Sequence, residues 1–182
     1  MDDTESLFCN QRIAVVIDTQ NVYYAARDLY EKLAEDCPDE VENKVGRVDF
    51  AELLNHIVGD RTLVHCVAFT TSTEEVDNTA FLRVLRDLRV TTKNRVVNPE
   101  KNRAMTWTTS FICEAMKWAA SGKVDAIVLV TGSGIYTDLA EYLRHYPISV
   151  EVASFTSVLS RALKETADRF IALEVDHLAN KQ

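Results

Sequence analysis

The stretch Arg12-Ile-Ala-Val-Val-Ile-Asp-Thr-Gln-Asn21 is an apolar run that ends in a carboxylate and an amide, where the chain turns into a helix. An uninterrupted apolar run between polar residues is typical of a strand that is buried on both faces, as in a parallel sheet. Open α/β folds bind their ligands at the carboxyl ends of such strands. We therefore expect Asp18 and Asn21 to lie at the carboxyl edge of a parallel sheet.

A second stretch, Asp125-Ala-Ile-Val-Leu-Val-Thr-Gly-Ser-Gly-Ile-Tyr-Thr-Asp-Leu139, repeats this design of strand, tight turn and helix. Adjacent parallel strands point the same way, so the two strand ends should meet at one edge of the sheet. The backbone N–H groups of such a turn bind anions, and we expect a phosphate to contact Thr131, Gly132, Ser133 and Gly134. The same four residues also suit a plain strand-to-helix connection.

Strands and helices alternate along the whole chain, which predicts βαβ units and a mainly parallel sheet. The expected strands span 12–18, 62–69, 89–97, 125–131, 149–155 and 170–173, and the expected helices span 21–35, 49–59, 74–88, 107–120, 135–145 and 159–167. Residues 37–46 should form a loop. The predicted fold class is an α/β three-layer sandwich with helices on both faces. We expect one domain at 12–175, with tails at 1–11 and 176–182.

The composition is that of a soluble globular protein, with 182 residues, 47% hydrophobic and 26% charged. A net charge of −8 excludes a general nucleic-acid coat protein, because phosphate binding needs clustered cations. Cations do cluster locally, since the segment from Arg83 to Arg103 holds seven of them and two acids. Four scattered cysteines and four isolated histidines do not have the spacing of a zinc site. The start of the chain does not read as a signal peptide, and no apolar run is long enough for a membrane span, so a cytoplasmic protein without membrane contact is expected.

These segments together resemble the NYN family (LabA-like proteins) of the PIN-like nuclease superfamily. The family's first strand ends in Asp-x-x-Asn, which Asp18 and Asn21 match. Its later strand ends in Ser-Gly-Asp-x-Asp-Phe, which here reads Thr131-Gly-Ser-Gly-Ile-Tyr136, without either acid. Two further family acids, on the central helix, align with Thr108 and Glu114. The resemblance spans nearly the whole chain and implies a PIN-like fold.

Members of this superfamily hydrolyse RNA with Mg²⁺ or Mn²⁺ held by several carboxylates, because a divalent ion needs hard oxygen ligands and negative charge. The resemblance makes Asp18 and Glu114 the candidate metal ligands and catalytic residues. Asn21 would position Asp18 or the substrate. Asp18 also suits the role of helix N-cap, and Glu114 that of an acid at the rim of the fold. Asp138 is the nearby candidate to replace a lost ligand, although its place in a helix also suits a surface acid. Metal binding is therefore expected to be weak, if it occurs.

The basic segment lies on the approach to the central helix, where contacts with an RNA backbone would be useful. We expect Arg95 and Arg103 to bind substrate, with help from Lys93 and Lys101. Trp107 either stacks on a base or belongs to the core. The same cations also suit a protein partner.

The resulting functional expectation is a catalytically impaired NYN module that binds RNA or a phosphorylated ligand. The first alternative is an active Mg²⁺- or Mn²⁺-dependent endoribonuclease that uses Asp18 and Glu114. The second is a protein-interaction scaffold, which would pair with a partner protein or form a homo-oligomer.

Overall fold

The computed structural model describes residues 10–73, 78–97 and 107–181. It confirms the predicted α/β class, with six parallel strands in the order β4-β3-β1-β5-β6-β7. The strands are β1 (Arg12–Asp18), β3 (Thr62–Thr73), β4 (Thr91–Val97), β5 (Ala126–Val130), β6 (Ser149–Phe155) and β7 (Arg169–Leu173). β1 lies between β3 and β5, so the strand that opens the fold is also central in the sheet.

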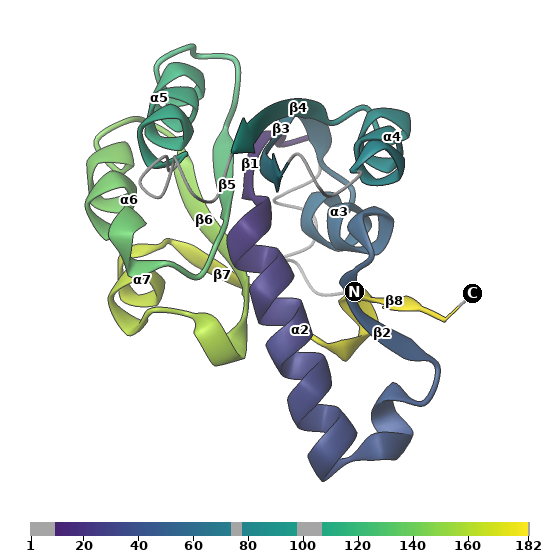
Figure 1. Cartoon of the computed structure of the whole chain (residues 1–182). Coiled ribbons are helices and arrows are strands. Elements are labelled where there is room, and N and C mark those ends of the chain that lie inside the picture. The colour runs from purple at the N-terminus through teal and green to yellow at the C-terminus, as the bar shows by residue number, and fades with distance from the viewer. Residues whose placement is uncertain (1–9, 74–77, 98–106, 182) are drawn as a thin grey trace.

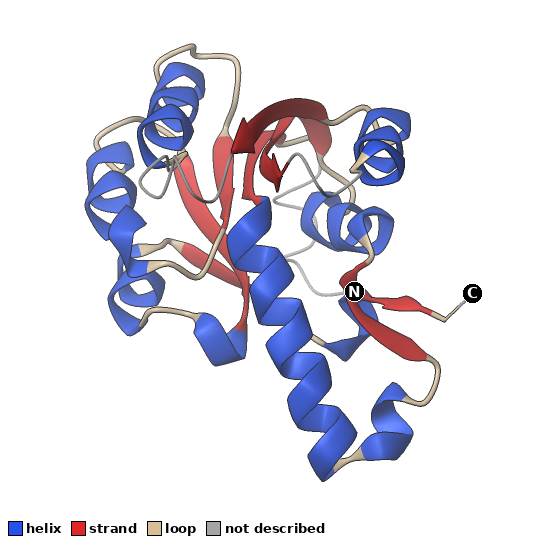
Figure 2. Cartoon of the chain, in the orientation of Figure 1, coloured by secondary structure: helices blue, strands red, loops and turns tan. Residues whose placement is uncertain are grey.

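Helices cover both faces of the sheet (Figures 1 and 2). One layer contains α2 (Thr19–Asp36), α3 (Phe50–Val58) and α4 (Thr79–Asp87), and the other contains α5 (Thr108–Ala119), α6 (Thr137–Leu143) and α7 (Arg161–Thr166). Strand side chains point alternately to the two faces. Val15 of β1 accordingly packs in the first layer's core and Val16 in the second's. The apolar run of β1 is buried because both of its faces are covered.

The predicted ends of α3 are confirmed in atomic detail. The side chain of Asp49 accepts hydrogen bonds from the backbone N–H groups of Ala51 and Glu52. At the other end Gly59 has a φ of 53°, a left-handed conformation that glycine adopts without a steric penalty. Sequence signals at helix ends were therefore sufficient to place this helix.

A second, small sheet was not predicted. β2 (Lys44–Val48) pairs antiparallel with β8 (Leu178–Asn180), within or beside segments expected to be a loop and a C-terminal tail. Two short 3₁₀ helices, η1 (Pro38–Val41) and η4 (Val175–His177), lead into and out of these regions. β2 lacks an apolar run, and its pairing partner lies at the far end of the sequence, so no local pattern reveals it.

Other expected boundaries shifted by a few residues. β3 continues to Thr73, because its last residues pair with β4 through Thr73 and Val97. The helix expected at 135–145 begins as the 3₁₀ helix η2 (Gly134–Tyr136) and continues as α6, and η3 (Thr156–Val158) precedes α7. α4 is shorter than the predicted 74–88, although residues 74–77 lie outside the described part.

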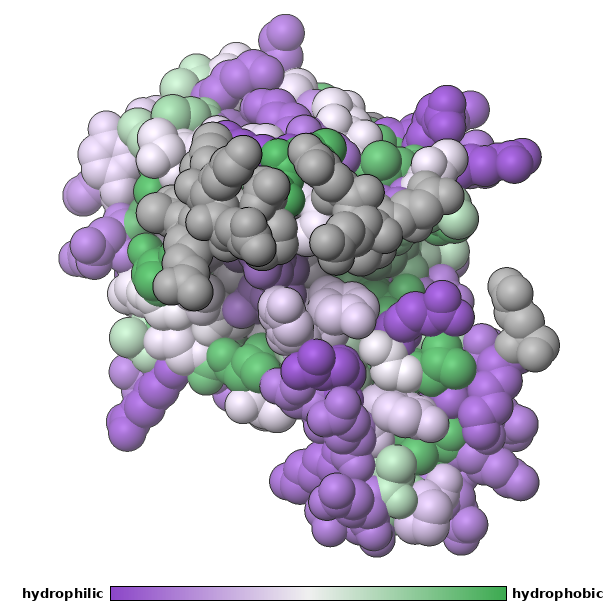
Figure 3. Space-filling model, viewed as in Figure 1, coloured by the Kyte–Doolittle hydropathy of each residue, from purple (hydrophilic) through white to green (hydrophobic). Residues whose placement is uncertain are grey.

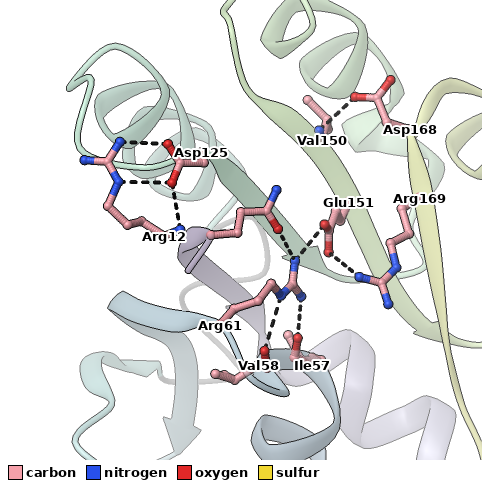
Figure 4. Close-up of polar contacts among 10 residues, drawn as sticks. Arg12, Ile57, Val58, Arg61, Asp125, Val150, Glu151, Asp168 and Arg169 are labelled. Atoms are coloured by element: carbon pink, nitrogen blue, oxygen red, sulfur yellow. Dashed lines mark hydrogen bonds and ion pairs between the residues drawn. The ribbon is translucent and has the colours of Figure 1, made fainter. Parts of the chain in front are cut away.

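Ion pairs join the amino edge of the sheet (Figure 4). Arg12 at the start of β1 binds Asp125 just before β5, with an N–O distance of 2.7 Å. Arg61, which follows α3, binds the fully buried Glu151 of β6 at 2.7 Å and also donates to the carbonyl oxygens of Ile57 and Val58. The amino edge is thus held by charged groups, and the opposite, carboxyl edge is left for the predicted site.

The end of α2 farthest from the sheet projects beyond it together with η1 (Figure 1), and hydrophilic side chains gather there (Figure 3). No helix in the described ranges has the length and apolar character needed to cross a bilayer.

Candidate functional site

Asp18 and the turn at 131–134 lie together at the carboxyl edge, where β1 and β5 end side by side. The side-chain oxygen of Asn21 accepts a hydrogen bond from the backbone N–H of Gly132 at 2.7 Å. This bond links the first turn of α2 to the turn that follows β5. The structure therefore brings Asp18, Asn21 and the glycine-containing turn into one site.

Asp18 acts as the N-cap of α2, since its Oδ1 accepts from the backbone N–H of Asn21 at 3.2 Å. Its Oδ2 accepts from the hydroxyl of Tyr136 at 3.4 Å. Burial raises the pKa of Asp18 above its ordinary value, and the hydrogen bonds from Asn21, Tyr136 and Gln20 oppose that rise. Both carboxylate oxygens thus have partners within the protein.

Tyr136 is the residue of this site that sequence reasoning did not single out. Its side chain is buried, its ring lies 4.3 Å from that of Phe111, and its hydroxyl also bonds the side chain of Thr108. Burial, followed by the negative charge of Asp18, raises the pKa of Tyr136. The phenol therefore stays protonated and links Asp18 with Thr108, the two positions that the sequence resemblance aligns with acids of the family.

The turn at 131–134 is pressed against the segment that follows β6. A Cβ atom on Gly132 would lie 2.6 Å from Ser154 Oγ and 2.8 Å from the carbonyl oxygen of Val158. The carbonyl of Gly132 accepts from the backbone N–H of Ser160 at 2.8 Å. Only glycine fits position 132, because a larger residue would push these two segments apart.

The remaining residues of the turn differ in exposure. Thr131 is buried, and its hydroxyl accepts from the backbone N–H of Ser133, which is half-buried. Ile135 is 61% exposed, and Asp138 is exposed on α6. An acid at position 133 or 135 would place a negative charge at the surface of this edge, whereas the serine and isoleucine found there are uncharged.

Glu114 lies away from Asp18, and its side chain extends from α5 toward β3 and β4. Its carboxylate binds Lys93 at 2.7 Å, Lys117 at 3.1 Å and the indole N–H of Trp118 at 3.0 Å. His65 Nε2 is 3.4 Å away. His65 pairs with Ala14 of β1. Ala14 precedes Asp18 by four residues, so the backbone level of His65 lies about 13 Å along the strand from that of Asp18.

These partners keep Glu114 charged. Burial raises its pKa, but the hydrogen bonds from Lys93, Lys117 and Trp118 outweigh that effect and lower the pKa to about 2. The carboxylate is 94% buried, since its residue is 6% exposed. In the described structure no hydrogen bond or ion pair joins Glu114 to Asp18, so the two candidate ligands do not form one cluster.

Two cations of the basic segment, Lys93 and Arg95, lie on β4, at the carboxyl edge of the sheet. Arg95 stacks over the ring of Trp107 at 4.0 Å, and Lys93 pairs in register with Phe69, the neighbour of Asp18 on β3. Trp107 donates from Nε1 to the carbonyl oxygen of Thr70 at 2.7 Å and packs against Phe69 at 5.3 Å. Its ring is therefore partly core and partly covered by arginine. Lys101 and Arg103 lie outside the described residues.

This donor set does not fit a divalent metal ion. Mg²⁺ and Mn²⁺ require several charged oxygen ligands in near-octahedral geometry, whereas Asp18 here accepts hydrogen bonds from backbone N–H groups and from a phenol. Among the described residues, no three His, Cys, Asp or Glu side chains gather closely enough to hold a metal ion. What the site presents instead is one capped carboxylate and a glycine turn.

A family model described as the NYN domain matches residues 12–174. No curated protein matched the chain. Among solved structures, a protein of unknown function from Vibrio parahaemolyticus RIMD 2210633 is similar, with a TM-score of 0.72 and 22% sequence identity. The match covers 94% of this chain and 98% of that one. At this identity the similarity shows the fold alone.

Proposed function

The chain belongs to the NYN domain family, which is related to ribonucleases, and from this premise we propose that it is a binding module in which metal-dependent RNA cleavage is impaired. The observation that carries the proposal is the surroundings of Asp18. Its two oxygens accept hydrogen bonds from Asn21 and Tyr136, and no second carboxylate of the described residues contacts it.

The expected weakness of metal binding has an electrostatic cause. Mg²⁺ loses hydration when it binds, and negatively charged ligands must offset that free-energy cost. A single carboxylate whose pKa is already raised by burial offsets little of it. The other acid expected from the family pattern is Glu114, and its negative charge is balanced by the positive charges of Lys93 and Lys117. The alternative of an active nuclease built on Asp18 and Glu114 would require those ion pairs to break.

RNA or another phosphate-bearing ligand is the proposed target. The half-buried Ser133 of the turn at 131–134 offers a hydroxyl group without a wall of carboxylates, whereas the backbone N–H groups of Thr131, Gly132 and Ser133 already donate to Ala153, Asn21 and Thr131. Arg95 lies on the β4 side of the same edge and would contact a phosphate backbone there. A protein with a net charge of −8 attracts a polyanion only through such a local patch.

Two assays on the purified protein separate binding from cleavage. Labelled single-stranded RNA is incubated with Mn²⁺, and we expect no cleavage above a no-protein control. Cleavage that depends on Mn²⁺ and disappears in Asp18→Asn would refute the proposal. As a positive comparison, the variant Thr108→Asp/Ser133→Asp/Ile135→Asp/Tyr136→Phe returns the family's residues to this edge, and it should bind Mn²⁺ measurably more tightly in calorimetry.

Binding is measured by fluorescence anisotropy of the same RNA with a chelator present, at several salt concentrations. Arg95→Ala should weaken binding and flatten the logarithmic salt dependence by roughly 0.7, the value for one lost phosphate contact on a single strand. Arg47→Ala, an exposed arginine on β2 in the small sheet, is the matched control and should leave both unchanged. If RNA does not bind even at low salt, this part of the proposal fails.

A further inference from the structure

A cleft of about 430 Å³ lies along the outer side of β7, where residues 169–172 form one of its walls. Successive residues of a strand point their side chains to opposite faces of the sheet. A cleft that contacts four successive residues therefore reaches the backbone of the strand as well as its side chains. β7 is the last strand in the sheet order, and within the described part of the chain it pairs only with β6.

An edge strand has backbone N–H and C=O groups that point away from the sheet, and these groups can pair with another extended chain. In β7 they face the cleft instead of a neighbouring strand. Arg169 is the cation of this wall, and its Nη1 lies 3.9 Å from the buried carboxylate of Glu151, as Figure 4 shows. The guanidinium thus points toward the sheet interior and leaves the outer side of the strand accessible.

The opposite wall comes from α3 and η4 and is held in place by several contacts. The backbone N–H of Asp49 donates to the carbonyl oxygen of His177 at 2.9 Å, which fixes η4 to the start of α3. The rings of His56 and His177 meet edge to face, with their centroids 4.6 Å apart. Since His177 Nδ1 accepts from the N–H of Glu174 at 3.0 Å, its Nε2 carries the proton in the neutral ring. The cleft is therefore preformed.

The rim of the cleft is acidic. Glu52, Glu174 and Asp176 line it and are all exposed, whereas Arg169 is its single lining cation and is directed at Glu151. A ligand that enters along β7 passes these three carboxylates. Charge complementarity favours a chain that carries cations.

We propose that the outer edge of β7 is a docking site for an extended, lysine- or arginine-bearing segment of a partner protein, which adds to the sheet as a further strand. Main-chain hydrogen bonds would supply affinity, and the acidic rim would select the charge of the segment. A second copy of this chain would place the same acids against one another, which is unfavourable. The first nine residues hold three acids and no lysine or arginine, so charge also disfavours them as the occupant.

The probe is a synthetic peptide of about eight alternating lysine and valine residues, long enough to pair along the whole of β7. Binding is followed by calorimetry at low salt, and hydrogen–deuterium exchange of residues 169–173 is measured with and without peptide. We expect binding that weakens with salt, together with slower exchange in β7. The matched control is the same peptide N-methylated at every backbone nitrogen, which keeps the charges but leaves no main-chain N–H group to donate to β7. Equal binding of this control peptide would overturn strand addition.

Single substitutions test the acidic rim. Glu52→Gln and Asp176→Asn should each weaken binding about two- to fivefold, the range typical of exposed ion pairs. Glu141→Gln, an exposed acid on α6 in the other helix layer, should leave the affinity unchanged. The proposal is overturned if the rim variants bind as well as the parent, or if a peptide with glutamate in place of lysine binds equally. Concentration-dependent dimerisation that protects β7 would assign the edge to a second copy instead.

Discussion

The two carboxylates that the family pattern aligns, Asp18 and Glu114, have opposite electrostatic surroundings. Burial dominates at Asp18 and raises its pKa. At Glu114 burial is outweighed by two lysines and an indole N–H, and the pKa falls to about 2. The two carboxylates therefore have different structural roles. Asp18 caps α2 at the carboxyl edge, and Glu114 links α5 to Lys93 of β4.

Tyr136→Phe tests the link between the phenol and Asp18. The hydroxyl lowers the pKa of Asp18, so its removal should raise that pKa further. Loss of the bonds to Asp18 and Thr108 should also reduce the free energy of unfolding by about 1 kcal/mol. The measurement is a carbon-13 NMR titration of the Asp18 carboxyl, with Tyr142→Phe, an exposed tyrosine on α6, as the control. An unchanged pKa of Asp18 would show that the hydroxyl does not act on it.

Glu114→Gln should destabilise the protein in a pH-dependent way. The folded-state pKa of about 2 lies below the reference value of 4.5, so the charged form stabilises the fold above pH 4.5, and this contribution disappears as the pH falls toward 2. We expect a loss of about 1–3 kcal/mol at pH 7, measured by urea unfolding. The difference from the parent should shrink below pH 4.5.

Glu165→Gln is the control for this prediction, because Glu165 pairs with Arg161 on the surface of α7 at 2.7 Å, with both side chains exposed. Exposed pairs contribute little, so a change below about 0.5 kcal/mol is expected. A loss at Glu114 that stays the same from pH 7 to pH 3 would contradict the assigned charge effect.

The sequence predicted that Asp18, Asn21 and the turn at 131–134 lie at one edge of the sheet, because each follows a buried apolar strand. It did not reveal that the Asn21 side chain binds Gly132, nor that Tyr136 joins Asp18 to Thr108. Those contacts depend on how α5, α6 and β1 pack, and their partners are remote in sequence. Candidate residues were therefore predictable from local pattern, whereas their partners were not.

At the level of the elements, Gly132→Ala should disturb the connection between β5 and α6. The added Cβ would approach a backbone atom, the carbonyl oxygen of Val158, at 2.8 Å, and a backbone segment moves less easily than a side chain. A loss of about 1–3 kcal/mol in thermal or urea unfolding is expected. In Gly134→Ala the Cβ meets only the side chain of Ser160, which is free to rotate, so the loss should be smaller. Equal losses would contradict this explanation.

The six strands of the main sheet and the helices between them could be predicted, since their apolar periodicity is strong. β2 and β8 could not, because β2 is a short, half-buried segment that contains Gly46 and the two charged residues Lys44 and Arg47. Its strand conformation comes from pairing with β8, which is a tertiary effect. β8 was expected to belong to a C-terminal tail, because a strand of three residues is too short to show an alternating pattern of apolar residues.

At the scale of the whole molecule, the buried pair of Arg61 and Glu151 connects the end of α3 with β6 across the sheet. Arg61→Met should cost about 3 kcal/mol, because Glu151 would remain buried with only Arg169, 3.9 Å away, to compensate its charge. The double variant Arg61→Met/Glu151→Leu should recover most of that loss. Chemical denaturation of the parent, the single and the double variants measures this. A double variant less stable than the single one would show that the pair itself stabilises the fold.

The pairing of β2 with β8 also has a consequence for synthesis of the protein on the ribosome. β2 is translated roughly 130 residues before β8, a delay of roughly 7 to 26 seconds at ordinary elongation rates. During that time the central strands can assemble, but the segment after α2 has no strand to complete its small sheet. The nascent chain therefore exposes an unpaired strand until β8 has been translated, and this segment is where a chaperone or a protease would first bind the nascent chain.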